Sequence, residues 1–142
     1  MLDIRTAPLG ALVLRLSLGI LFLAHAGLKI LVFTPAGTSQ FFQSLGLPGP
    51  LAYVVIAAEV IGGLALILGI LTRFVALALV PILIGAIITV HAAPGWQFSA
   101  PGGGWEFPAF WIAALIVQAL IGDGALALYP KLGAESRQAV AR

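Results

Sequence analysis

Long apolar runs with few charges dominate the chain, and each is about as long as a lipid bilayer is thick. A hydrocarbon core of roughly 30 Å needs about 20 apolar residues of helix to cross it. None of the runs alternates between polar and apolar residues, as a membrane-spanning strand does. The pattern therefore predicts an all-α fold, an integral membrane four-helix bundle in a single transmembrane domain (residues 1–142), with helices at about 9–31, 50–71, 73–91 and 106–128.

The basic residues between and beyond these runs indicate an orientation. Arg5, Arg73 and three basic residues of the C-terminal tail lie on one side of the predicted bundle, whereas residues 32–49 and 92–105 contain no Lys or Arg. Lys and Arg are enriched in cytoplasmic loops. Both termini are therefore expected on the cytoplasmic side, with the two long loops outside. Residues 38–45 are expected to form a short helix lying on the outer membrane surface.

Composition excludes several classes of protein. With 61% hydrophobic and 8% charged residues and a mean hydropathy of +1.14, the chain has too little charge to cover a soluble domain. The net charge of +2 comes without a basic cluster, so we expect no nucleic-acid partner. The absence of cysteine excludes disulfides, thiolate metal sites, iron–sulfur clusters and covalently attached haem.

The N-terminal run has features of a cleavable signal peptide. Arg5 precedes the apolar stretch 16–23, and Ala24-His25-Ala26 resembles a cleavage site. Arg15, however, interrupts the apolar core that such a signal needs. We therefore interpret this run as a retained transmembrane helix.

Ionisable side chains inside the predicted spans demand a reason, because each costs at least about 2.5–3.5 kcal/mol near the bilayer centre. Arg15, His25 and Lys29 recur at helical spacing on one stripe of the first span. Glu59 is the lone charge of the second span, on a face with small residues that admit a neighbouring helix. We predict that Arg15 pairs with Glu59; Asp123, at nearly the depth of Arg15, is the alternative partner.

Four polar residues fall in the outer third of the predicted spans: His25, Lys29, His91 and Glu106. With Glu59 below them, they indicate a pocket that opens outward between the helices. Structural roles compete with this interpretation, since a buried ion pair can fix helix register and Lys29 can extend to the headgroups. No catalytic role is assigned, although His25 and Glu59 are the candidates, and no metal site is expected. The predicted ligand-binding residues are Arg15, His25, Lys29, Glu59, His91 and Glu106.

The two halves of the chain show a faint resemblance to each other. His25-Ala26 ends the first span and His91-Ala92 ends the third, and each is followed by a Pro/Gly-rich outer loop and then by a carboxylate, Glu59 or Glu106. Both halves run outward and then back inward. The pattern is that of a parallel internal repeat.

These residues resemble the DoxX family of small four-helix bacterial membrane proteins, over roughly residues 10–125. Two positions depart mildly from the family pattern: Ala26 stands where Gly is more common, and Phe107 where Tyr is. The motifs that carry the resemblance are Leu14-Arg15-Leu16 through Gly19, Phe22, His25 and Lys29; Ala57-Ala58-Glu59, Gly62-Gly63, Leu68-Gly69 and Thr72-Arg73; and Val90-His91 with Gly103-Gly104-Trp105-Glu106-Phe107-Pro108.

The resemblance implies a multi-pass protein of the bacterial plasma (inner) membrane with a redox-associated role near the quinone pool. On this basis the chain is expected to be a quinone- or small-molecule-binding component of a membrane oxidoreductase system, with quinone as its ligand and no covalently bound cofactor. No flavin or nicotinamide motif is present, so a partner redox protein would supply electrons. Haem b held by His25 and His91 is not expected from two interfacial histidines.

Two alternatives remain open at this point. One is a protein that binds or transports a small anion or metabolite, for which a homodimer is expected because four helices are few for a transporter. The other is a membrane assembly factor. Family analogy is an associational argument and does not choose between an enzyme component and these alternatives.

Overall fold

The computed structural model describes residues 5–128, and every regular element within them is helical. The all-α prediction is confirmed. The elements are α1 (Ala7–Gly27), the π-helical turn η1 (Leu28–Val32), α2 (Pro35–Ser44), α3 (Leu51–Leu68), α4 (Thr72–Ala86), the π-helical turn η2 (Ile87–His91) and α5 (Glu106–Ile121).

Three helical segments are long and apolar enough to cross a membrane: Ala7–Val32, Leu51–Leu68 and Thr72–His91. The 16-residue α5 is apolar but shorter. Large apolar side chains point outward on all of them; Val13, Phe74 and Leu120 are 64%, 73% and 72% exposed. Such a surface is expected where lipid is the solvent.

Glycines end two helices earlier than the apolar runs suggest. The fourth helix was expected to reach residue 128, but α5 ends at Ile121 because Gly122 adopts φ 85° and ψ −154°. Residues 122–128 instead cross the end of the bundle, where Ala125 N–H donates to Pro8 O (2.9 Å) and Leu128 N–H to Leu68 O (3.1 Å). Helix α3 likewise ends at Leu68, since Gly69 is left-handed (φ 70°).

The short helix α2 begins at Pro35, three residues earlier than expected. Thr34 is its N-cap, and the Thr34 hydroxyl oxygen accepts a hydrogen bond from Gly37 N–H (3.1 Å). Proline suits the first helical position because its missing N–H would be unsatisfied there in any case.

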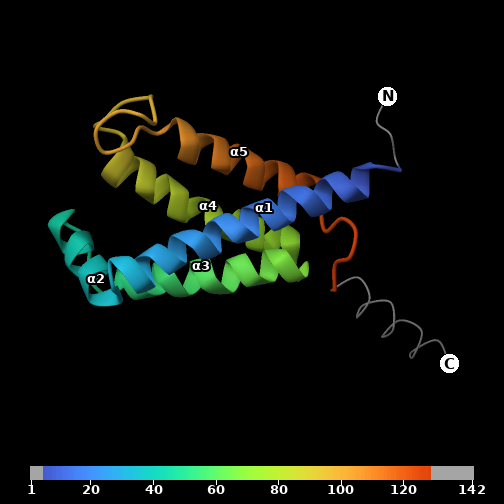
Figure 1. Cartoon of the computed structure of the whole chain (residues 1–142), viewed down its shortest axis with the longest axis horizontal. Coiled ribbons are helices and arrows are strands. Elements are labelled where there is room, and N and C mark those ends of the chain that lie inside the picture. Colours follow the sequence, from blue (N-terminus) through green and yellow to red (C-terminus); the bar gives the residue numbers. More distant parts are fainter. Residues whose placement is uncertain (1–4, 129–142) are drawn as a thin grey trace.

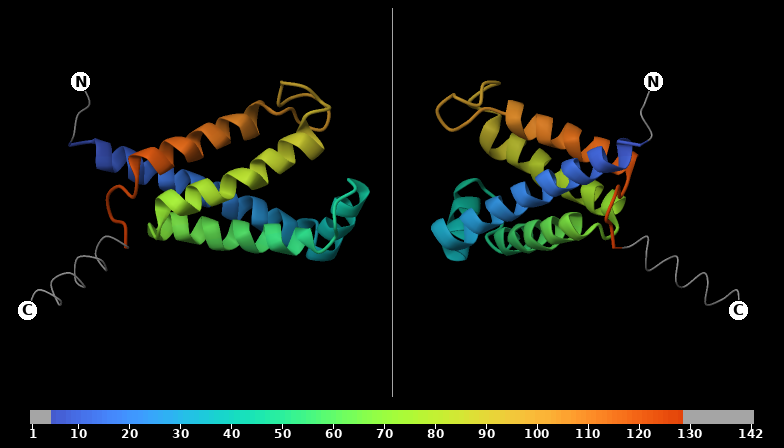
Figure 2. Two further views of the ribbon diagram at one scale, coloured as in Figure 1. Left: turned by 180° about the vertical axis from the view of Figure 1, so that it is seen from behind. Right: turned by 45° about the vertical axis from the view of Figure 1, so that its right-hand side comes forward.

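The four long helices form a ring in the order α1, α3, α4, α5. The views in Figures 1 and 2 show that they meet closely at the end where α5 finishes and α1 starts. Toward the opposite end, the α1–α3 pair diverges from the α4–α5 pair, with α2 beside the first pair and the loop 92–105 beside the second.

Close backbone contact sets the register of α1 against α3. A Cβ atom on Gly19 would lie 2.8 Å from Gly63 O, and one on Gly63 would lie 3.0 Å from Gly19 O, so glycine at both positions lets the two backbones approach this closely. Gly62 faces α4 instead, since a Cβ atom there would lie 2.8 Å from Leu79 Cδ2. The core below the divergence consists of Leu18, Phe22, Leu66, Ala76, Leu79, Leu83, Trp111, Leu115 and Ala119.

Candidate functional site

A cavity of about 930 Å³ lies where the two helix pairs diverge. One wall comes from the end of α1, η1, α2 and α3, and the other from α4, η2, the start of α5 and its preceding loop. The lining is mostly aliphatic and aromatic. The side chains of the lining that carry charged, imidazole or hydroxyl groups are His25, Lys29, Thr38, Glu59, Thr89 and His91.

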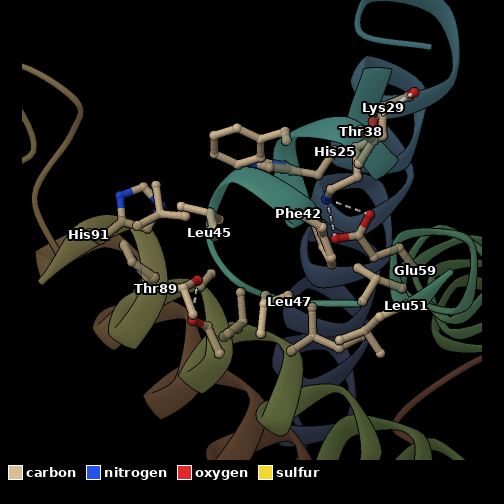
Figure 3. A pocket seen from close by; sticks show the side chains of 18 of the residues that line it. His25, Lys29, Thr38, Phe42, Leu45, Leu47, Leu51, Glu59, Thr89 and His91 are labelled. Carbon is tan, nitrogen blue, oxygen red and sulfur yellow. Dashed lines mark hydrogen bonds and ion pairs between the residues drawn. The ribbon is translucent and has the colours of Figure 1, made fainter. Parts of the chain in front are cut away.

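Lys29 and Glu59 form an ion pair in the cavity wall. The Lys29 Nζ atom lies 2.6 Å from Glu59 Oε1 and 2.8 Å from Oε2, drawn as dashed lines in Figure 3. The Glu59 side chain is 5% exposed and that of Lys29 is 20% exposed. The predicted Arg15–Glu59 pair is therefore wrong, because Lys29 takes the place assigned to Arg15.

The register of α1 and α3 explains this correction. The helices are antiparallel and touch at Gly19 and Gly63, so Arg15 lies opposite Gly69, where a Cβ atom would collide with the guanidinium. Gly69 is ten residues from Glu59, about 15 Å along the helix. The periodicity of the sequence predicts which face of the helix carries Arg15. It does not predict which residue of α3 lies opposite Arg15 along the helix axis, and this axial position decides its partner.

Arg15 consequently belongs to the opposite end of the bundle and not to the cavity. It is buried, its Nη2 donates to Ala125 O (3.1 Å), and Asp123 is the acidic group whose charge acts on it. Asp123, the alternative partner, is thus its electrostatic neighbour. The segment 122–128 holds the guanidinium in place.

Both histidines lie at the cavity, and each is held by a carbonyl. His25 Nδ1 is 3.0 Å from Leu21 O in its own helix, and His91 Nδ1 is 2.8 Å from Gly103 O in the loop before α5. Figure 3 shows His91 and Thr89 on a different wall from Lys29 and Glu59. The structure therefore brings four of the six predicted residues together: His25, Lys29, Glu59 and His91.

Both π-helical turns contribute to the site. Lys29 lies in η1 and His91 lies in η2, at equivalent places at the ends of α1 and α4. Single π-helical turns are rare and occur frequently at functional sites. The turns do not align with the internal repeat seen in the sequence, since His91 lies in η2 whereas His25 lies in α1, before η1.

Glu106, the sixth predicted residue, does not line this cavity. It is the first residue of α5, and its Oε1 accepts a hydrogen bond from Phe98 N–H (3.1 Å). This bond folds the loop 92–105 back onto α5. Glu106 therefore shapes the loop whose Gly103 carbonyl holds His91.

Trp111 is a cavity residue that the sequence analysis missed. It is 4% exposed, and its ring centroid lies 4.5 Å from that of Phe22 and 4.9 Å from that of His25. It is packed against the imidazole and supports its orientation. Its sequence signal is a tryptophan one helical turn after Phe107, inside an apolar run and away from the interfacial positions where tryptophan is usual.

The site as a whole carries balanced charge. Lys29 and Glu59 carry opposite charges and form an ion pair. Across residues 5–128, no cluster of three or more His, Asp or Glu side chains lies close enough to hold a metal ion. The arrangement is suited to binding a neutral, largely apolar molecule that carries a few hydrogen-bonding groups.

Comparisons with known proteins agree with the resemblance seen in the sequence. The DoxX family model matches residues 10–92. The chain is 42% identical over 126 residues to "Putative oxidoreductase CatD" of Bacillus subtilis (strain 168), covering 89% of each chain. It is 43% identical over 68 residues to "Inner membrane protein YqjF" of Escherichia coli (strain K12), covering 48% of this chain and 51% of the relative.

No solved structure matches the chain significantly. The family assignment therefore rests on the sequence comparisons, which span more than half of the chain. On this evidence the chain belongs to the DoxX family of membrane proteins.

Proposed function

We propose that the cavity binds a neutral, mostly apolar ring compound with oxygen substituents, of the quinone class, and that the protein serves as the ligand-binding component of a membrane oxidoreductase system. In this proposal the chain crosses the bacterial inner membrane four times, with both termini in the cytoplasm. Electrons come from a partner redox protein.

The observation that carries the proposal is the closed Lys29–Glu59 pair in an apolar cavity. Both carboxylate oxygens already accept from the ammonium, so the site offers no net charge to an anion. Arg15, the other cation expected to bind an anion, is buried at the far end of the bundle. A neutral ligand therefore fits better than the small anion of the transport hypothesis.

Size and lining support the same class of ligand. Small-molecule pockets are typically about 300–1,000 Å³ and mostly apolar with a few polar groups, and the cavity of about 930 Å³ has this character. Phe42 and Phe107 are among its aromatic lining residues. A relative that covers most of the chain is named as an oxidoreductase, which is consistent with a redox role.

The test is binding of a short-chain quinone to the purified protein in lipid nanodiscs. The probe is 2,3-dimethoxy-5-methyl-1,4-benzoquinone, and benzoate is the matched anion. We expect the quinone to raise the unfolding temperature, since a ligand that binds only the folded state stabilises it. Benzoate is expected to have no such effect.

Two adjacent alanines provide a matched pair of variants. Ala58 lines the cavity and Ala57 is exposed on the outside of α3. Ala58→Phe should weaken quinone binding at least about tenfold by filling the cavity, whereas Ala57→Phe should leave it unchanged. Equal quinone binding by both variants, or preferential binding of benzoate, would reject the proposed function.

A further inference from the structure

The hydrogen-bond partners of the two cavity histidines fix which ring nitrogen carries the proton. A carbonyl oxygen only accepts hydrogen bonds, so Nδ1 must be the donor both in His25, facing Leu21 O, and in His91, facing Gly103 O. A neutral imidazole has a single N–H. In its neutral form, each ring therefore presents Nε2 as an acceptor.

Both acceptors are available to a ligand. Within residues 5–128, no group is bonded to Nε2 of either ring, and neither atom is among the buried polar atoms that are sealed from their surroundings. Both residues line the cavity. His25 of α1 and His91 of η2 thus bring two unpaired ring nitrogens to the lining of the cavity.

The other polar side chains of the cavity have largely used their donors. The Thr38 hydroxyl donates to Thr34 O (2.9 Å), and the Thr89 hydroxyl donates to Gly85 O (2.8 Å). Lys29 directs its ammonium at both oxygens of Glu59, which leaves one N–H. The Trp111 indole N–H also has no partner, but this atom is buried and not exposed at the cavity surface. The accessible unpaired side-chain groups of the cavity are therefore mainly acceptors.

We propose that the cavity binds the reduced, dihydroxy form of its ring ligand in preference to the oxidised diketone, with His25 and His91 each accepting one of its O–H groups. This inference rests on the proposed function and names the redox form of the ligand. The diol supplies two O–H donors. The diketone has only acceptors, so its oxygens would face the imidazole lone pairs without a hydrogen between them.

The preference for the diol sets a ratio of affinities, and this ratio shifts the reduction potential of the bound ligand. One net hydrogen bond changes affinity by up to about tenfold, so two should favour the diol by roughly 10–100-fold. Tighter binding of the reduced form raises the reduction potential of the bound couple. For a two-electron couple, each tenfold difference corresponds to about 30 mV.

The experiment compares three forms of one ring with the full-length protein in nanodiscs under anaerobic conditions. The probes are 2,3-dimethoxy-5-methyl-1,4-benzoquinone, its hydroquinone, and the hydroquinone dimethyl ether, which keeps the ring but has no O–H. We expect the hydroquinone to bind at least about tenfold more tightly than the other two. The dimethyl ether makes the test independent of whether any variant folds.

His25→Phe and His91→Phe keep a flat ring but remove the acceptor, so each should reduce the ratio of hydroquinone to quinone affinity. Equal binding of quinone, hydroquinone and ether would overturn the inference while leaving the proposed function in place. Absence of binding by all three would overturn both. A preference for the quinone would show that the cavity presents donors instead.

Discussion

Lys29 and Glu59 lie 30 positions apart in the chain, yet the Lys29 ammonium is 2.6 and 2.8 Å from the two oxygens of the Glu59 carboxylate. The pair joins η1 to α3 on the wall of the cavity. Glu59 is almost fully buried, and Lys29 is its ion-pair partner among the described residues. The pair therefore stabilises the splayed end of the bundle and keeps the cavity neutral.

The first prediction concerns the energy of this pair. Lys29→Met should destabilise the folded protein because it leaves a buried carboxylate unpaired, which costs about 3–5 kcal/mol in a fully buried pair and less here because Lys29 is partly exposed. Glu59→Gln should also destabilise it. The double variant should recover much of the loss, with a coupling of about 0.5–3 kcal/mol in unfolding measured in detergent.

A second double-mutant cycle, between Arg15 and Glu59, provides the control for the cycle between Lys29 and Glu59. Arg15→Gln and Glu59→Gln should act additively, because these residues lie at opposite ends of the α1–α3 contact. Coupling between Arg15 and Glu59, together with additivity of Lys29 and Glu59, would contradict the structure.

The second prediction concerns the glycine beneath Arg15. Gly69→Ala places a Cβ against the Arg15 guanidinium and 2.6 Å from the Cβ of Ala127, at a residue with φ 70°. Left-handed backbone and overpacking each cost roughly 1–3 kcal/mol for a residue with a side chain. The free energy of unfolding should therefore fall by about 2–5 kcal/mol.

Gly27→Ala is its matched control. Gly27 has helical geometry (φ −58°), and a Cβ atom there meets nothing within 4 Å. The variant should be neutral or more stable by up to about 1 kcal/mol, since alanine favours helix. A similar loss from both substitutions would mean that Arg15 does not pack on Gly69.

The third prediction concerns the loop that holds His91. A Cβ atom on Gly104 would collide with backbone carbonyls of the same loop, including Trp96 O at 2.5 Å. Gly104→Ala should displace the neighbouring Gly103 carbonyl and release His91 Nδ1. Gly104 is thus a positioning residue, and its substitution should lower hydroquinone affinity about as much as His91→Phe does.

The comparison with His91 supplies the check on this third prediction. Combining Gly104→Ala with His91→Phe should lower hydroquinone affinity no further than either change alone, since both act through one imidazole. Additive losses would show that the loop affects the ligand by another route.

Periodicity was enough to predict the helical fold and to bring His25, Lys29, Glu59 and His91 to one site. It failed where vertical register matters, since the Gly19–Gly63 contact places Lys29 and not Arg15 beside Glu59. It also failed at residues 122–128, where Gly122 ends α5 although most of the residues that follow are apolar. Helical periodicity assigns residues to a face of a helix but does not give the axial register between two helices. Hydropathy, likewise, does not show where the backbone leaves helical φ and ψ values.

The last prediction tests the number of spans and their orientation. The chain has no cysteine, so single cysteines report their own positions without background. Ser99 is exposed in the loop before α5, and Ser136 follows the described residues. With a membrane-impermeant maleimide on intact cells, Ser99→Cys should label and Ser136→Cys should label only after permeabilisation. This requires α5 to cross, although its 16 residues span only about 24 Å of a roughly 30 Å core, so we expect local thinning of the bilayer around it. External labelling at both positions would mean that α5 does not cross, and labelling at Ser136 alone would reverse the orientation inferred from Arg5 and Arg73.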